Sequence, residues 1–345
     1  MTTGARDWGL GASRMPTVVG VGFRLRAERF GEARRSVWNG SDAKAVSRPR
    51  RCLRAVCLVL FLVCAGEILG SSSLEAQQPS PRRIVSLVPS VTETLFAMGA
   101  GPRVAAVSSY DAFPPEVEKL PRVGALFDPD VERILSLRPD LVIVYGSQTD
   151  LKARLQRASI PMYEYRHGSL ADVTRSIRDL GVRLGMDDAA RTLAATIDNA
   201  FAEIRARVKG VPRPTTMLVI GREPGSLRAI NVSGGFGFLH DLLDLAGGAN
   251  VFADVKRESM LVSTETILAR APEVIIELHY AEPPVPASVE RERRVWQLLP
   301  GVPAVKAGRV HLLYGGELVV PGPRVVITAR TFARALHPDL MPSGK

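Results

Sequence analysis

Cysteine is missing from most of this chain of 345 residues. All three cysteines, Cys52, Cys57 and Cys64, lie before residue 65. The long remainder therefore has no disulfide and no thiol nucleophile, and its stability must come from packing.

The motifs of well-marked enzyme classes are also missing. The chain contains no Walker A loop, no GxSxG elbow and no HExxH sequence, and each of these marks a known catalytic site. Its longest apolar run, residues 55–65, falls short of the roughly 20 residues that a membrane-spanning helix needs. We therefore expect neither an enzyme nor an integral membrane protein.

Residues 1–76 have the order of an export leader. Arg50, Arg51 and Arg54 precede the apolar run, and a small-residue segment ending at Ala76 follows it. This order predicts a signal peptide cleaved after Ala76. We interpret the long basic stretch before it as a start codon placed too far upstream, with a disordered extension as the alternative. A lipid anchor on Cys64 is possible but not favoured.

Most of the positive charge belongs to this leader. The net charge is +10, and residues 1–76 hold 12 Lys/Arg and 6 Asp/Glu, or +6, which leaves 10 − 6 = +4 for the rest. So small an excess gives no reason to expect a nucleic-acid partner.

Two segments far apart in the chain are self-similar. Residues 132–143 read ERILSLRPDLVI, and residues 265–276 read ETILARAPEVII. Each predicts a short helix with an acid in its first turn, a proline-marked turn and a buried strand. A repeated supersecondary unit predicts two similar lobes.

Strand and helix patterns alternate on both sides of a long helical stretch. This alternation predicts an α/β protein with two lobes, each with a central, mainly parallel sheet flanked by helices, and one long helix joining them. Residues 90–93 have the spacing of a capping box, with Ser90 and Glu93 as its ends. The expected strands are residues 83–87, 104–107, 141–144, 162–165, 217–220, 274–277 and 309–313. The expected divisions are the leader 1–76, a lobe 77–185, the helix 186–210 and a lobe 211–345.

From residue 83 onward the chain resembles the periplasmic substrate-binding proteins of ABC importers for cobalamin and iron-siderophores. It is most similar to the cobalamin branch through its SSYD and Pro-Pro segment. The signatures are IVSLVPSVTE (84–93), SSYD (108–111) with Pro114 and Pro115, VERIL (131–135) with RPDLV (138–142), AGGANV (246–251) and Glu265. The resemblance implies a monomer that binds a small molecule between its lobes and delivers it to a permease dimer in the membrane.

The resemblance also assigns a role to the repeated glutamates. Glu132 and Glu265 fall where the family places one exposed acid on each lobe, paired with arginines of the permease. Two carboxylates on a pseudo-twofold protein suit a twofold partner. The alternative is that both acids only favour their helices electrostatically.

Ligands of open α/β sheets bind beyond the carboxyl ends of the strands. Tyr145, Arg222 and Tyr314 occupy such positions, and Phe127 precedes the first repeat helix. The resemblance also places Tyr110 at the position of a tyrosine that contacts the ligand in the cobalamin-binding proteins. We expect these five to bind the ligand, through aromatic platforms above all. Leu126 and Glu317 stand where those binders carry tryptophans.

His167 and His279 follow strands in opposite lobes and raise a second hypothesis, a metal or cobalt centre held in the cleft. No HxH or HxxxH spacing supports it, so we expect no resident metal and no cofactor, with cobalamin as transported ligand. The alternatives are an iron-siderophore, haem or metal-ion binder of the same class and, from another class, an exported enzyme or ligand-sensing domain. The predicted location is periplasmic or extracytoplasmic.

Overall fold

The computed structural model describes residues 80–280 and 285–340. The predicted leader, with its signal peptide and Cys64, lies outside this part. Within the described residues, no helix combines the length and hydropathy needed to cross a membrane.

The first lobe is built on a parallel sheet of four strands in the order β2-β1-β3-β4. All three strand pairs are parallel, as the alternating pattern predicted. The strands are β1 (Ile84–Ser86), β2 (Val104–Val107), β3 (Leu141–Tyr145) and β4 (Met162–Tyr165). The helices are α2 (Pro89–Ala97), α3 (Val131–Ser136) and α4 (Thr149–Arg157), with 3-10 turns at Gly101–Arg103 and Pro115–Lys119.

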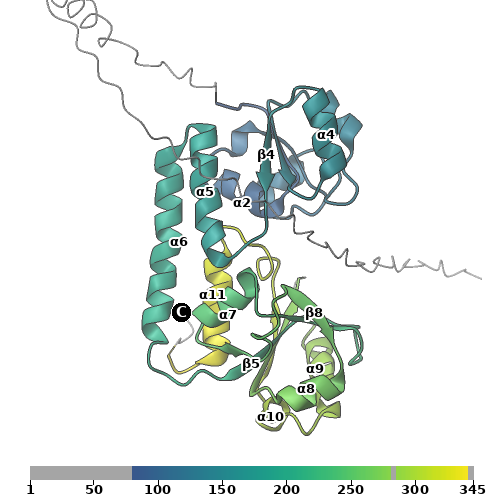
Figure 1. Ribbon diagram of the computed structural model, residues 1–345, viewed down its shortest axis with the longest axis vertical. Coiled ribbons are helices and arrows are strands. Elements are labelled where there is room, and N and C mark those ends of the chain that lie inside the picture. Colours follow the sequence, from purple (N-terminus) through teal and green to yellow (C-terminus); the bar gives the residue numbers. More distant parts are fainter. Residues whose placement is uncertain (1–79, 281–284, 341–345) are drawn as a thin grey trace, which may run out of the picture. The chain divides into compact units, whose positions relative to one another are not determined.

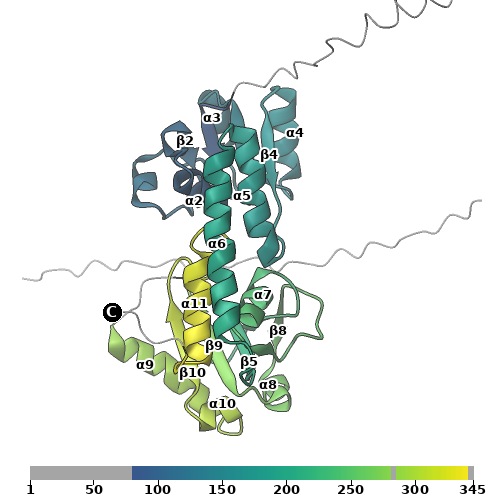
Figure 2. The same cartoon turned by 90° about the vertical axis from the view of Figure 1, so that its left-hand side faces the viewer.

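Two long antiparallel helices follow the first sheet (Figure 1). α5 (Leu170–Leu184) ends at Gly185, whose φ of 64° is a left-handed conformation that glycine adopts readily. α6 (Asp187–Arg207) has 21 residues and is therefore about 30 Å long. It packs along α5 and reaches α7 and α11 of the second lobe, as Figure 2 shows. α6 is the long helix that the sequence predicted between the lobes.

The second lobe has a six-stranded mixed sheet. Its main order is β10-β9-β5-β6-β8, and β7 pairs with β5. The strands are β5 (Thr215–Gly221), β6 (Ile230–Ser233), β7 (Ala249–Asn250), β8 (Ser259–Val262), β9 (Val274–His279) and β10 (Val310–Tyr314). The helices are α7 (Phe238–Leu245), α8 (Thr264–Arg270), α9 (Pro286–Val295), α10 (Pro303–Lys306) and α11 (Val325–Leu336), with a 3-10 turn at Trp296–Leu298.

The antiparallel side of this sheet was not predicted. β6 pairs antiparallel with both β5 and β8, so the second sheet is less parallel than expected. β8 is an edge strand that alternates between exposed and half-buried residues, and it lacks the aliphatic run that marks a buried strand.

A single hydrophobic cluster extends through both lobes. It includes Leu95 of α2, Ile177 of α5, Ile197 of α6, Leu218 of β5 and Phe332 of α11. Because close-packed interiors deform little, a core shared in this way opposes large movements of one lobe against the other.

The predicted capping box at the start of α2 is wrong. The helix begins at Pro89, its N-cap is Val88, and no side chain caps it. Glu93 instead accepts hydrogen bonds from Arg324 of the second lobe. The spacing of Ser90 and Glu93 fits a cap, but the tertiary partner determines where the carboxylate points.

The two copies of the repeat match in backbone detail. Arg138 and Ala271, the residues before the prolines, have φ of 48° and 46°. The acid after each proline accepts a backbone N–H at the start of a neighbouring strand: Asp140 from Arg83, and Glu273 from Thr215. Each unit therefore fastens its helix and turn to the sheet in the same way.

Candidate functional site

The carboxyl ends of β3 and β4 form a pocket of about 490 Å³ in the first lobe. Tyr145 ends β3, Tyr165 ends β4, and His167 follows two residues later. The Tyr145 and His167 rings stack, with centroids 6.0 Å apart and planes 24° apart, and Tyr165 meets both rings edge-on. Burial lowers the pKa of His167, so its imidazole is neutral at pH 7.

Two loops carry the other predicted aromatic residues of this lobe, Tyr110 and Phe127, and both side chains are exposed. The side-chain amide of Gln148, three residues after β3, donates a hydrogen bond of 3.0 Å to the carbonyl of Leu126 and so holds the Phe127 loop. Ser109 N–H donates 2.8 Å to the carbonyl of Gly124, which links the Tyr110 loop to the Phe127 loop. Tyr110 and Phe127 therefore belong to loops tied to the turn that follows Tyr145, although neither lines the pocket.

A buried carboxyl supports the Tyr110 loop. Asp111 accepts the N–H of Ser108 at 2.8 Å through Oδ2, while Oδ1 has no partner among the described residues. Arg122 donates to the carbonyls of Ser108 and Asp111. Burial raises the pKa of Asp111 to about 7, against the opposing effects of its hydrogen bonds and of the Arg122 charge.

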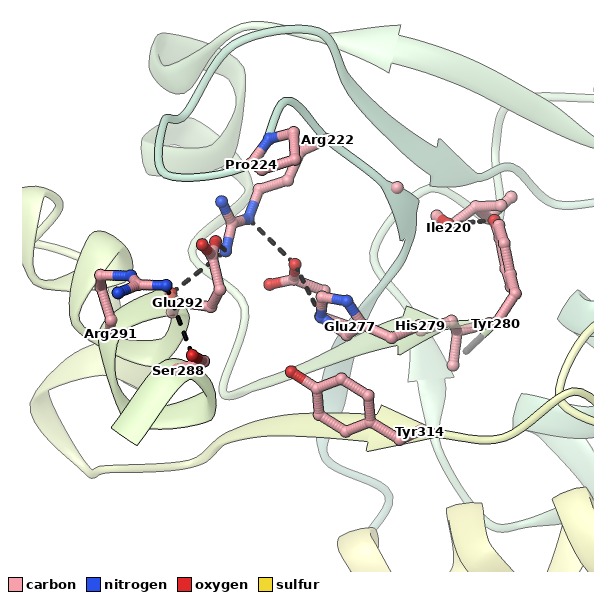
Figure 3. Close-up of a pocket in the computed structure, with 12 residues that line it drawn as sticks. Ile220, Arg222, Pro224, Glu277, His279, Tyr280, Ser288, Arg291, Glu292 and Tyr314 are labelled. Carbon is pink, nitrogen blue, oxygen red and sulfur yellow. Dashed lines mark hydrogen bonds and ion pairs between the residues drawn. The ribbon is translucent and has the colours of Figure 1, made fainter. Parts of the chain in front are cut away.

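The second lobe has a larger pocket, about 530 Å³, where β5, β9 and β10 end (Figure 3). His279 ends β9 and Tyr314 ends β10, and the two residues are register partners in the parallel pair. Their rings stack with centroids 4.5 Å apart and planes 15° apart. The Tyr280 hydroxyl donates to the carbonyl of Ile220 and closes one side. Both lobes thus present a stacked histidine and tyrosine at their strand ends.

A buried ionic network lies on the other side of this pocket. Arg222, which follows β5, is almost inaccessible; its Nε lies 3.0 Å from Oε1 of Glu277 and its Nη2 lies 3.0 Å from Oε2 of Glu292. The indole N–H of Trp296 donates to Oε2 of Glu277 at 2.7 Å. A ligand anion would have to compete with two carboxylates for Arg222, so direct ligand contact by this residue stays a prediction.

Glu277 also lies under the stacked pair. Its Oε1 is 3.1 Å from Nε2 of His279, the contact drawn in Figure 3. Burial acts to raise the pKa of Glu277, but the contacts with His279 and Trp296 and the Arg222 charge together hold it below the usual value. The carboxylate therefore stays ionised beside the ring of His279.

Groups of the second lobe lie close to the first pocket. Asp241 of α7 accepts the backbone N–H of Leu170 at 2.8 Å. The exposed carboxylate of Glu258 acts on His167 and raises its pKa, against the larger effect of burial. The loop before Glu258 is held by the amide of Gly235, which donates to the carbonyl of Val255 at 2.7 Å. A Cβ on Gly235 would lie 2.1 Å from the carbonyl oxygen of Ala253, so this glycine allows close backbone packing.

A buried ion pair connects the lobes directly. Arg324, at the start of α11, donates through Nε at 3.0 Å and Nη2 at 2.6 Å to the two carboxylate oxygens of Glu93 in α2. Its Nη1 lies 3.2 Å from Glu317, and its guanidinium covers the ring of Phe113 at 4.0 Å. Burial raises the pKa of Glu93 despite this partner.

The sequence predicted several residues of the two pockets and missed others. It named Tyr145 and His167 in one pocket and Arg222, His279 and Tyr314 in the other. It missed Glu258, Glu277, Glu292 and the Arg324–Glu93 pair. An acid inside the aliphatic run 274–278 was the available signal for Glu277, because buried acids are rare unless paired. Among the described residues, no group of three or more potential ligands could hold a metal ion.

Residues 84–314 match the sequence profile of the periplasmic binding protein family. The chain belongs to this family. It is therefore a substrate-binding protein of ABC transport and not an enzyme, as the motifs predicted, and its class works with a small ligand and a membrane permease.

Curated relatives of this family cover most of the chain. The vitamin B12-binding protein of Salmonella typhimurium is 28% identical over 256 residues, which are 74% of this chain and 90% of the relative. An uncharacterized ABC transporter substrate-binding lipoprotein of Bacillus subtilis is 27% identical over 267 residues, covering 75% of this chain and 81% of the relative.

Solved structures share the fold. The apo periplasmic haem-binding protein of Roseiflexus sp. RS-1 superposes with a TM-score of 0.63 at 26% identity, covering 75% of this chain and 99% of that one. The periplasmic vitamin B12-binding protein of Vibrio cholerae superposes with a TM-score of 0.65 at 24% identity, covering 76% of this chain and 99% of that one. These similarities confirm the two-lobed α/β architecture.

Proposed function

We propose that this protein binds cobalamin or a related corrinoid between its lobes and delivers it, unchanged, to an ABC importer. The observation that carries the proposal is the stacked histidine–tyrosine pair at the strand ends of each lobe. A corrinoid is a broad, partly apolar disc with amides on its rim, and aromatic faces suit such a ligand better than charges do.

The remaining contacts follow from the two pockets. Tyr145 and Tyr314 face the ligand from opposite lobes, and Tyr110 and Phe127 add exposed aromatic surface beside the first pocket. Arg222 acts through its ion pair with Glu277, which holds His279 in place. Relatives named as vitamin B12-binding proteins support this choice of ligand.

A haem-like iron complex is the second candidate, and the two imidazoles favour it. Glu277 lies at Nε2 of His279, which leaves Nδ1 for another partner, and His167 lies in the other lobe. Imidazole nitrogen is a common ligand of iron. In this case the metal belongs to the cargo.

Delivery requires docking to the permease in the membrane. We assign this role to the exposed Glu132 and Glu265, one at the start of α3 and one at the start of α8. The protein would act as a monomer outside the cytoplasm, free after cleavage at Ala76, with a lobe at 77–185, the helix at 186–210 and a lobe at 211–345.

Titration of the purified protein tests the ligand. We expect cyanocobalamin to bind with a changed visible spectrum and a calorimetric stoichiometry of one. Tyr145→Ala should weaken binding about tenfold or more, whereas Tyr163→Ala should change it by less than about twofold, because Tyr163 is a β4 tyrosine that lines neither pocket. Tight binding of haem or a ferric siderophore without cyanocobalamin binding would replace the corrinoid by the second candidate.

A further inference from the structure

The two pockets differ in the formal charge of the side chains that line them. The lining of the second pocket includes two arginines and two glutamates, which are Arg222, Arg291, Glu277 and Glu292 (Figure 3). The lining of the first pocket includes one arginine, Arg166, and no acid. The arginines and glutamates of the second pocket therefore balance, whereas the first pocket keeps one positive charge.

The local backbone places Arg166 at the end of the neighbouring strand. Arg166 directly follows β4, and the N–H of Gly146, directly after β3, donates a hydrogen bond of 2.8 Å to the carbonyl of Tyr165. A Cβ on Gly146 would lie 3.2 Å from Cγ of Arg166, closer than ordinary van der Waals contact. Glycine at this position therefore leaves room for the arginine beside Tyr145, the last residue of β3.

The guanidinium of Arg166 is available to a ligand. Arg166 is exposed, and its side chain forms no ion pair or hydrogen bond with the rest of the described chain. Arg222 in the second pocket is different, because its guanidinium is almost inaccessible and already contacts the carboxylates of Glu277 and Glu292. An anionic group of a ligand would have to displace a carboxylate from Arg222, but it would meet no such competitor at Arg166.

We propose that Arg166 binds an anionic oxygen group of the ligand, a phosphate or a carboxylate, at the mouth of the first pocket. A guanidinium presents a planar fork of N–H donors that matches both groups. The inference rests on the proposed function and deepens it. A ligand whose ring system lies against the stacked aromatic residues would direct its acidic substituent toward the first lobe.

The neighbouring side chains of the lining add donors without adding charge. Ser147 and Tyr145 both carry hydroxyls in this pocket. Burial raises the pKa of Tyr145, so its hydroxyl stays protonated and can donate to an oxyanion. Burial lowers the pKa of His167, so its imidazole is neutral and leaves Arg166 as the charged group of the lining.

One carboxylate of the second lobe opposes an anion in this pocket. Glu258 acts on both His167 and Tyr165 and raises their pKa values, although it forms no ion pair with Arg166 among the described residues. Removing the charge of Glu258 should therefore change the affinity for an anionic ligand in the opposite direction to removing the charge of Arg166.

Two corrinoids that differ by a phosphate test the role of Arg166. Cyanocobalamin carries a phosphodiester in its nucleotide loop, and dicyanocobinamide lacks both the nucleotide and the phosphate. Arg166→Gln should weaken the binding of cyanocobalamin about tenfold and leave that of dicyanocobinamide within about twofold of wild type, as measured by calorimetry. Arg154→Gln is the matched control, because Arg154 is an exposed arginine of the same lobe that lines neither pocket, and it should change neither affinity.

The charge reversal of the effect gives a second measurement. Glu258→Gln should strengthen the binding of cyanocobalamin by about twofold at low ionic strength and less in high salt, without changing that of dicyanocobinamide. Equal weakening of both corrinoids by Arg166→Gln, or no weakening of either, would overturn the proposal.

Haem and its dimethyl ester separate this inference from the corrinoid assignment. If neither corrinoid binds, the corrinoid assignment fails and the haem pair replaces it, because haem carries two propionates that the ester masks. Weaker haem binding by Arg166→Gln with unchanged binding of the dimethyl ester would support Arg166 as the partner of a carboxylate. Equal effects on haem and its ester, or no binding of either, would overturn the proposal.

Discussion

The two lobes use the same repeated unit and the same stacked histidine–tyrosine pair, but they support them differently. In the first lobe the pocket is aromatic, and one buried acid, Asp111, lies in a neighbouring loop with its pKa raised. In the second lobe the buried acid is Glu277, which lies under the pair with its pKa lowered. Similar backbone units can therefore carry opposite electrostatics.

The difference follows from the partners of each carboxylate. Arg122 gives its hydrogen bonds to backbone carbonyls beside Asp111, so desolvation dominates there. Arg222 and Trp296 contact Glu277 directly, and their favourable interactions exceed the cost of burial. We therefore expect the ion pairs of Glu277 to hold the second pocket rigid. We expect the Tyr110 loop to depend on the carboxyl of Asp111, which titrates near neutral pH.

Removing the Glu277 charge should have the largest effect on folding. Glu277→Gln leaves Arg222 buried with only Glu292, and breaking a buried pair costs about 3 kcal/mol or more. Glu164→Gln is the matched control, because Glu164 forms a partly exposed pair with Lys152 at 3.0 Å and should cost less than about 1 kcal/mol. Urea unfolding measures both, and equal losses would show that the network does not brace the second lobe.

The pH dependence of stability should have opposite signs for Asp111 and Glu277. The pKa of Asp111 is about 7 in the folded protein against 3.8 for a free side chain, so between these values the folded state holds the proton that the unfolded state releases. Stability therefore falls as pH rises through this window. In this pH window, the free energy of unfolding of Asp111→Asn should rise relative to that of the wild type by up to about 1.4 kcal/mol per pH unit.

The same unfolding series distinguishes Asp111 from Glu277. The pKa of Glu277 is lowered from 4.5 in the folded protein. Its charge therefore stabilises the fold at pH values above 4.5, and this contribution is lost as the pH falls. The difference between wild type and Glu277→Gln should therefore shrink toward acid pH. A pH-independent difference for Asp111→Asn would contradict the raised pKa.

The smallest expected effect is on the distance between the lobes. The shared core, α6 and the Arg324–Glu93 pair all oppose hinge motion, so ligand should cause little compaction in solution X-ray scattering. Arg324→Gln removes the ion pair but not α6, and should enlarge the change. A large compaction of the wild-type protein with ligand would refute the rigid connection.

Sequence patterns predicted the local elements well and the long-range contacts poorly. Aliphatic runs and prolines gave the strands of the first lobe, α6 and both repeat units, because those signals are local. The edge strand β8 lacks an aliphatic run and was missed. Glu93 was assigned to a cap because its partner, Arg324, lies 231 residues away. The strand-end rule found Tyr145, His167, His279 and Tyr314, but no local pattern shows that Arg222 is enclosed by Glu277 and Glu292.

The most direct test of the account reverses both repeat glutamates. Glu132→Lys with Glu265→Lys places lysines at two exposed positions, where they would repel the permease arginines of the proposed docking contact. We expect cyanocobalamin affinity, measured by calorimetry, to remain within about twofold of wild type while uptake into cells is abolished. Normal uptake by this variant, or loss of ligand affinity, would contradict a two-lobed binding protein that docks through its repeat.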